Sequence, residues 1–183
     1  MTSSGSKNTF LQRLIGAAAL DAAIYEEVEA DPSATSQALL VVVLSSVAAG
    51  IGAGTVAAPS AARIAFFSVV DLLAWAAWAI VTYEIGTRLL PGEETQASVG
   101  QLLRTLGFAA TPGLLRVLGV MPAVTVPVFA VTAIWMLAAM IVAVRQALDY
   151  RTTARAVGVC VLGWVLALIL TIVLGLVFGP SVS

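Results

Sequence analysis

The chain contains no histidine and a single cysteine, Cys160, among its 183 residues. Histidine is the side chain that most often transfers protons in catalysis at neutral pH, so its absence removes that chemistry. One cysteine can form neither an internal disulfide nor a thiolate zinc site, and we expect Cys160 to be a packing residue. These absences predict a protein without a catalytic site, a bound metal or another cofactor.

Charged residues are scarce as well: they make up 10% of the chain, against about one quarter in an ordinary soluble domain. With a net charge of −1 and no basic cluster, no nucleic-acid partner is predicted. Apolar residues make up 60%, which is more than a soluble fold of this length can bury. The composition therefore predicts an all-α polytopic bundle in the lipid bilayer, where helices satisfy their own backbone groups.

Five segments are predicted to cross the membrane, because about 20 mostly apolar residues span the hydrocarbon core. They are residues 36–57, 63–85, 99–121, 124–144 and 156–178. The third segment is the weakest, since it holds Arg104 and Arg116 and is interrupted at Pro112. We expect it to be kinked or partly re-entrant, with neighbouring helices covering the backbone groups that the break sets free.

The residues before the spans, 1–31, are predicted to form a cytoplasmic unit, and residues 32–183 to form the transmembrane domain. After a polar tail, apolar residues recur every three or four positions from Asn8 to Ala30, which predicts one amphipathic helix. Asp31 suits the N-cap of the next helix and Pro32 its first position. Most charges on this segment are acidic, so we expect it to dock on the bundle or on a protein partner rather than on anionic lipid.

Lysine and arginine are enriched in cytoplasmic loops, so the positive charges predict the orientation. With five spans and a cytoplasmic N-terminus, two of the nine positive charges, Arg63 and Arg116, lie outside. The other seven lie inside: Lys7, Arg13, Arg88, Arg104, Arg145, Arg151 and Arg155. A re-entrant third segment would instead place the last three of these outside. Five spans with the N-terminus inside is therefore the preferred topology.

Asp71 lies inside the second predicted span, and it is a candidate ligand-binding residue together with Arg104 and Pro112. A carboxylate near the bilayer centre costs about 2.5–3.5 kcal/mol, so we expect Asp71 to face the bundle interior and to be paired or protonated. Its functional role would be a proton or cation relay. Its structural role would be to pair with an arginine or to cap polar backbone near the broken third segment. Transport needs a path of several polar groups, so the structural role is preferred.

Four acidic residues near the N-terminus are predicted to dock a partner: Asp21, Glu26, Glu27 and Glu29. Asp21 falls on the apolar side of the predicted helix, where an unpaired acid would be costly. We expect it to contact an inner arginine such as Arg88 or Arg151, or alternatively another protein. The acidic run that ends at Asp31 is expected to be a solvated face plus a helix cap. It lacks the ligand-dense loop of a calcium site, so no metal is predicted there.

Three strings resemble bacterial members of the Yip1 family. They are LDAAIYEEVEADPSAT (Leu20–Thr35), VGQLLRTLGFAATPGLLRVLG (Val99–Gly119), and WMLAAMIVAVRQALDY with ARAVGVCVLGW (between Trp135 and Trp164). The resemblance covers nearly the whole chain and implies a cytoplasmic N-terminal segment, about five transmembrane helices and no catalytic residues. Eukaryotic relatives act in vesicle trafficking and bind prenylated Rab GTPases. This chain has a much shorter N-terminal region and lacks their aromatic-rich cytosolic signature, so that role is not carried over.

These observations favour a non-enzymatic membrane scaffold or adaptor that binds partner proteins. The alanine-rich composition, with arginine favoured over lysine, indicates a bacterium with a GC-rich genome and hence its cytoplasmic membrane. The alternative is a small transporter or channel subunit that uses Asp71 and the broken third segment. An enzyme is disfavoured because a lone aspartate without histidine supplies no nucleophile–base pair. Small-residue stripes suit packing within one chain as well as a homo-oligomer, so both remain open.

Overall fold

The computed structural model describes residues 8–53, 61–93, 95–121 and 123–178, and in this part of the chain every regular element is helical. The elements are α1 (Phe10–Ala18), α2 (Ala22–Ala30), α3 (Ala34–Gly52), α4 (Ala61–Glu84), the π-helix η1 (Ile85–Leu89), α5 (Val99–Phe108), the 3₁₀-helix η2 (Thr111–Val120), α6 (Thr125–Ala147) and α7 (Thr153–Phe178). The predicted all-α bundle is confirmed.

The N-terminal segment is helical and amphipathic as predicted, but it forms two helices instead of one. Leu20 takes a left-handed conformation, with φ of 62°, which ends α1. Asp21 then caps α2, because its side chain accepts a hydrogen bond from the backbone N–H of Ala23 at 3.0 Å. Asp21 is exposed, so the expected contact with Arg88 or Arg151 is replaced by this local cap. The first seven residues lie outside the described part.

Three helices of the described chain are long and apolar enough to cross a membrane: Ala34–Gly52, Ser68–Leu89 and Thr125–Ala147. The described side chains of α7 add a shorter apolar helix, Thr153–Ile169. The third predicted span is α5 followed by η2. The break lies where expected, at Thr111-Pro112, because proline has no N–H for an α-helical hydrogen bond and suits the start of a new helix. Five spans remain a prediction.

Helix α3 runs alongside α5 and η2 in the same direction, with small residues between them. A Cβ atom added to Gly107 would lie 2.6 Å from the Cβ of Ala38, and one added to Gly113 would overlap the Oγ of Ser45. At the far end, a Cβ on Gly52 would overlap the carbonyl oxygen of Arg116. Glycine, alanine and serine let the two backbones approach closely, as in other membrane helix pairs.

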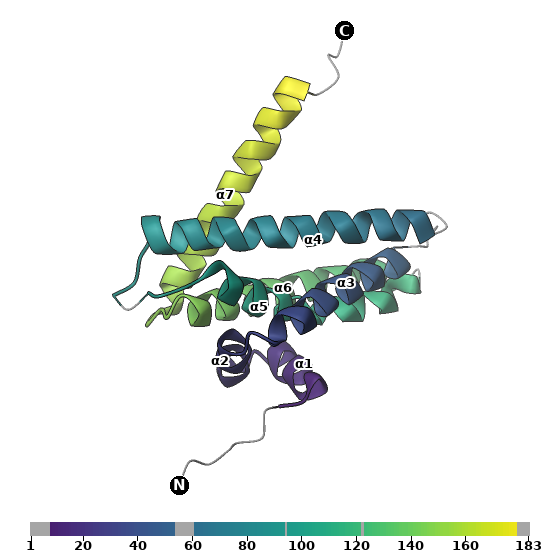
Figure 1. Cartoon of the computed structure of the whole chain (residues 1–183). Helices are drawn as coiled ribbons and strands as arrows, with labels where there is room; N and C mark the ends of the chain where they lie inside the picture. The colour runs from purple at the N-terminus through teal and green to yellow at the C-terminus, as the bar shows by residue number, and fades with distance from the viewer. Residues whose placement is uncertain (1–7, 54–60, 94, 122, 179–183) are drawn as a thin grey trace.

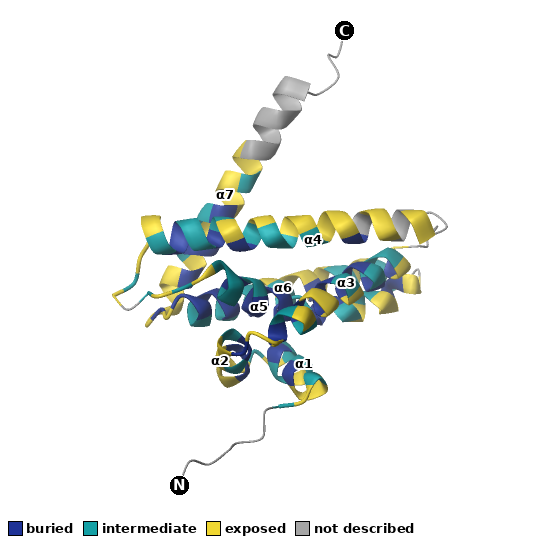
Figure 2. Ribbon diagram, in the orientation of Figure 1, coloured by how far each residue is buried: buried dark blue, intermediate teal, exposed yellow. Residues whose placement is uncertain are grey.

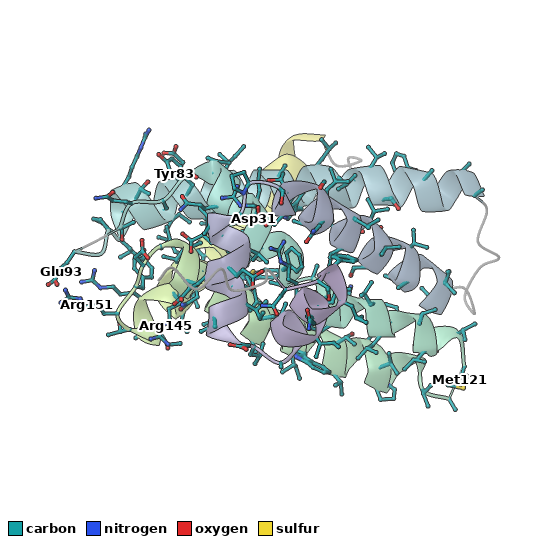
Figure 3. The ribbon with its side chains drawn as sticks, turned by 60° about the horizontal axis from the view of Figure 1, so that its bottom comes forward. Asp31, Tyr83, Glu93, Met121, Arg145 and Arg151 are labelled. Carbon is teal, nitrogen blue, oxygen red and sulfur yellow. The ribbon has the colours of Figure 1, made fainter. Side chains whose placement is uncertain are left out.

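The long helices pack as a layer with α4 above it, and α1 and α2 lie against its side. In Figure 1, α4 lies over a layer formed by α3, α5 and α6, and α7 leaves this layer at a steep angle. Figure 2 shows that the outer side of α4 is mostly exposed, whereas α5 is largely buried within the bundle. Figure 3 shows Glu93, Arg145 and Arg151 at one end and Met121 at the other. Helices α1 and α2 cross the side of the bundle between these ends.

Candidate functional site

A buried ionic network joins α1 and α2 to the start of the membrane bundle. Its centre is Arg13 on α1, which is only 2% exposed. The guanidinium donates to Glu27 at 2.9 and 3.0 Å, to Asp31 at 2.8 Å and to the side-chain oxygen of Gln37 at 3.0 Å. Asn8 donates to the same Glu27 carboxylate through both its backbone N–H and its side-chain amide. We call Asn8, Arg13, Glu27, Asp31 and Gln37 the ionic joint.

The ionic joint keeps its central pair ionised although it is shielded from water. Burial disfavours the charged guanidinium, but the hydrogen bonds and charges of Asp31 and Glu27 outweigh it and raise the pKa of Arg13. Burial likewise acts to raise the pKa of Glu27, but the hydrogen bonds from Asn8 and Arg13 prevail and lower it. One buried arginine therefore holds two carboxylates, and removing it would take the ion pair away from both of them.

The joint had a signal in the sequence. Arg13 lies three residues after Phe10 and four before Ala17, on the side of the helix predicted to be apolar. Glu27 and Asp31 are four residues apart and follow Ile24 at helical spacing, so they too fall on a buried stripe. Arg13 lies on the buried face of one segment, and Glu27 and Asp31 lie on the buried face of the following segment. This arrangement predicts an internal ion pair, because an unpaired buried charge is costly. What the sequence did not show is the turn at Leu20 that brings the stripes together.

The structure divides the four predicted docking acids into two groups. Glu27 belongs to the ionic joint, and Glu29 accepts a hydrogen bond from the side chain of Gln101 on α5 at 2.8 Å. Both are therefore occupied within the chain, and the acidic run is not the fully solvated face that was expected. Asp21 and Glu26 are exposed, and Glu26 accepts one hydrogen bond from Gln146 at 2.7 Å. These two remain available to a partner.

Arg104, a predicted ligand-binding candidate, belongs to the same region. Its guanidinium donates to the carbonyl oxygens of Val28, at 3.0 Å, and of Glu29, at the last turn of α2. These carbonyls have no partner inside their own helix, so Arg104 serves as a side-chain cap that fixes α2 to α5. The structure therefore places Arg104 away from Asp71, with which the sequence grouped it.

The carboxyl group of Glu29 is expected to make stability depend on pH. Burial raises its pKa from the ordinary 4.5 to about 7, and the charge of Asp149 adds to the rise, against the opposing effects of Gln101 and Arg104. Between these two values the folded state binds more protons than the unfolded state, so stability should fall as pH rises. Thermal unfolding in detergent from pH 4.5 to 8 should show this fall in the wild type and lose it in Glu29→Gln.

Glu84→Gln, which changes an exposed acid at the end of α4, is the matched control and should keep the wild-type slope. The lowered pKa of Glu27 acts in the opposite direction at lower pH, where protonation removes stability, and this acidic limb should persist in Glu29→Gln. An unchanged slope between pH 4.5 and 7 in Glu29→Gln would contradict the assignment.

A second candidate site lies between α3, α4 and η2. Here Asp71 and Arg116 line one pocket of about 220 Å³, together with residues of α3, α4 and α6 and the residue that precedes η2: Val42, Ser45, Ser46, Trp75, Met136 and Ala110. Asp71 attracts the Arg116 guanidinium electrostatically. Arg116 also donates to the Thr132 hydroxyl at 3.3 Å and lies 5.4 Å from the centre of the Phe129 ring.

Two of the predicted ligand-binding candidates, Asp71 and Pro112, lie at this pocket in different ways. Asp71 lines it, although its residue is exposed and not enclosed by the bundle as was expected. Pro112 is buried behind it and acts through the backbone, since it begins the 3₁₀-helix that carries Arg116 to the pocket. The sequence did not predict that Asp71 and Arg116 line the same pocket, because the two lie 45 positions apart, on segments whose register depends on that 3₁₀ geometry. Within the described residues, no group of acids, cysteine and histidine could hold a metal ion.

Comparison with known proteins shows which family this helical bundle belongs to. The family model described as the Yip1 domain matches residues 21–174, from the cap of α2 into α7. The chain belongs to the Yip1 family. No curated protein matches it, and no solved structure does. The family match confirms the resemblance found in the sequence. Together with its apolar helices, it makes this Yip1-family chain an integral membrane protein.

The match also bears on the ionic joint. Glu27 and Asp31 fall inside the matched region, whereas Arg13 precedes it. In this Yip1-family chain, α1 therefore adds a buried cation to two acids of the matched domain. The pocket around Asp71 and Arg116 lies wholly within the match.

Proposed function

We propose that this Yip1-family protein is a non-enzymatic membrane adaptor, and that its paired helices α1 and α2 are the element that docks a partner on the cytoplasmic side of a bacterial membrane. The observation that carries the proposal is an exposed surface on two helices that precede the predicted spans in the sequence. On α1, Leu11 and Ile15 are 65% and 62% exposed and lie one turn apart. Asp21, the cap of α2, and Glu26, on α2, are exposed as well and follow α1 in the sequence.

The ionic joint supports this role because it fixes the docking surface before a partner arrives. Further contacts reinforce it: the indole N–H of Trp135 on α6 donates to the carbonyl of Ala18 at 2.7 Å, and the ring of Phe10 packs edge-on against Phe108. A surface that is already ordered loses less conformational entropy on binding than a flexible tail would. The complementary partner would offer an apolar groove for α1 and a basic rim for the two exposed acids, Asp21 and Glu26.

Site-specific photo-crosslinking in cells tests the adaptor role. A crosslinker at Leu11 or Ile15 should capture a reproducible protein, and mass spectrometry should map the linked peptide to α1. The double variant Leu11→Gln/Ile15→Gln should lower the yield by about tenfold or more, as expected for two central apolar anchors. The charge reversals Asp21→Lys and Glu26→Lys should lower it further.

A crosslinker at Leu73 on α4 is the matched control, since this leucine is 66% exposed on a predicted span and should meet lipid. If the Leu11 and Leu73 probes capture the same proteins, or if the double variant keeps the full yield, the docking surface is not on α1.

Transport is the second candidate, and the pocket that joins Asp71 and Arg116 is the observation in its favour. Transporters bind solutes at intramembrane sites built from broken helices, and η2 is such an element. In sealed liposomes, a proton or ion flux that Asp71→Asn abolishes while the protein stays folded would support transport. No flux in the wild type would contradict it.

A further inference from the structure

The pocket around Asp71 continues into a second, larger space. This groove has a volume of about 470 Å³ and shares Trp75, Arg116 and Met136 with the pocket. The rest of its lining is apolar or aromatic and comes from four helices: Ala74, Trp78, Leu106, Ala109, Ala133, Leu137, Met140, Trp164 and Ala167. The two spaces form one elongated site, charged at one end and apolar along the rest.

The walls of this groove belong to helices that carry apolar residues on their outer faces. On α4, Val69, Val70 and Leu73 are exposed beside it, and on α6 Ile134 and Leu137 are exposed. In an integral membrane protein such faces contact hydrocarbon, so the space between them opens toward lipid chains. An apolar groove of this kind fills with an acyl chain more readily than with water, because a water molecule would lack hydrogen-bond partners there.

The charged end of the site is suited to a ligand that carries both a positive and a negative charge. Asp71 forms no hydrogen bond or ion pair with another described residue, and it lies at a depth where an uncompensated carboxylate is costly. Among the described residues, Arg116 makes a long hydrogen bond to Thr132, at 3.3 Å, and faces the ring of Phe129. The hydroxyls of Ser45 and Ser46 line the same space. The pocket therefore offers a carboxylate, a guanidinium and two hydroxyl donors.

We propose that this site binds phosphatidylethanolamine from the surrounding bilayer, with its headgroup between Asp71 and Arg116 and one acyl chain in the groove. The primary ammonium pairs with the Asp71 carboxylate, and the phosphate accepts hydrogen bonds from Arg116 and the two serines. An anionic phosphatidylglycerol satisfies Arg116 but leaves Asp71 without a cation. Phosphatidylcholine carries both charges, but its quaternary ammonium has no N–H to donate.

The aromatic side chains of the groove fit a lipid tail and its ester linkage. Trp78 packs against Trp164 with ring centres 5.6 Å apart, and these rings close the groove at the α7 side. The indole N–H groups of Trp75 and Trp78 have no hydrogen-bond partner within the described residues. A lipid ester carbonyl in the groove supplies an acceptor toward which either ring can turn.

Native mass spectrometry of the purified full chain tests the proposal. The protein is released from mixed micelles that contain equal amounts of phosphatidylethanolamine, phosphatidylcholine and phosphatidylglycerol. The wild type should retain phosphatidylethanolamine about tenfold or more above the other two, the ratio expected for one added charge-assisted hydrogen bond. Asp71→Asn should abolish this preference while still retaining phospholipid. Arg116→Gln should lower the retention of all three.

Matched controls separate the site from general lipid contact. Glu84→Gln and Arg88→Gln change an exposed acid and an exposed base on the same α4–η1 segment, and both should keep the wild-type preference. Ala133→Leu fills the groove without altering a charge, and it should displace the retained lipid while circular dichroism stays helical. It provides an independent test if Arg116→Gln fails to fold.

Several results would overturn the proposal. Equal retention of the three lipids by the wild type would do so, as would an unchanged preference in Asp71→Asn or unchanged lipid retention in Ala133→Leu. An ion flux that depends on Asp71 and is insensitive to phosphatidylethanolamine would assign the pocket to a transported solute. None of these outcomes bears on the docking role of α1 and α2, because that role is read out by crosslinking at Leu11 and Ile15.

Discussion

Replacing Arg13 by methionine is expected to detach α1 from the bundle. The substitution keeps the length and the apolar stem of the side chain but removes the guanidinium that forms ion pairs with both Glu27 and Asp31. Breaking a buried ion pair from one side costs about 3–5 kcal/mol, because the partner charge is left without compensation. Hydrogen–deuterium exchange should show the amides of α1 and α2 exchanging faster by two to three orders of magnitude, on the order of that free energy.

Two further variants make this expectation specific. Arg88→Met removes an arginine whose ion pair with Glu84 is exposed and one helical turn away, and exposed pairs of this kind contribute less than about 1 kcal/mol. The triple variant Arg13→Met/Glu27→Gln/Asp31→Asn neutralises the whole cluster and should recover much of the lost protection. Slow exchange of α1 in Arg13→Met, or the same loss in Arg88→Met, would show that the joint does not hold the helices.

Replacing Gly52 by alanine is expected to force α3 away from η2. The added Cβ would overlap the carbonyl oxygen of Arg116, which is a backbone atom and cannot turn aside as a flexible side chain would. Overpacking at such a contact costs about 1–3 kcal/mol. Arg116 should shift with its backbone, so Gly52→Ala should also weaken lipid retention in the site that this arginine lines.

Gly158→Ala is the matched control for this glycine. There the nearest atom to an added Cβ is the Cδ1 of Leu90 at 3.7 Å, an ordinary van der Waals distance. Within helix α7, alanine should stabilise by about 0.4–1 kcal/mol through the lower entropy of the unfolded chain. Unfolding in mixed micelles should thus give effects of opposite sign for the two substitutions. Equal effects would show that α3 and η2 are not in close contact at Gly52.

The sequence was sufficient to predict the helices and the break in the third span. Apolar runs of about 20 residues have few alternatives to a membrane helix, and Thr111-Pro112-Gly113 removes an N–H inside such a run. It did not predict the turn at Leu20, because leucine with positive φ is uncommon and leaves no compositional mark. Without that turn, α1 and α2 read as one continuous amphipathic helix.

The candidate sites were predicted less completely, because their residues come from helices that are far apart in the sequence and meet only through packing. Asp71 was singled out because an acid in an apolar run is rare, a property that the sequence displays directly. Its neighbour Arg116 depends on how α3, α4 and η2 pack, which depends in turn on close contacts such as Ala38 with Gly107. The role of Glu27 and Glu29 was misjudged as a solvated face for two reasons. The pairing of Glu27 with Arg13 depends on the turn at Leu20, and that of Glu29 with Gln101 depends on how α2 packs against α5.

The 3₁₀ geometry of η2 has a consequence for how the chain matches the thickness of its bilayer. Helices α5 and η2 hold 10 residues each. At a rise of about 1.5 Å per residue in an α-helix and about 2.0 Å in a 3₁₀-helix, they extend roughly 15 and 20 Å. Their sum of about 35 Å exceeds by about 5 Å what 20 residues of α-helix would reach, and it covers a hydrocarbon core of about 30 Å. With this longer rise, the third predicted span, the least apolar of the five, would bridge the same thickness as its neighbours.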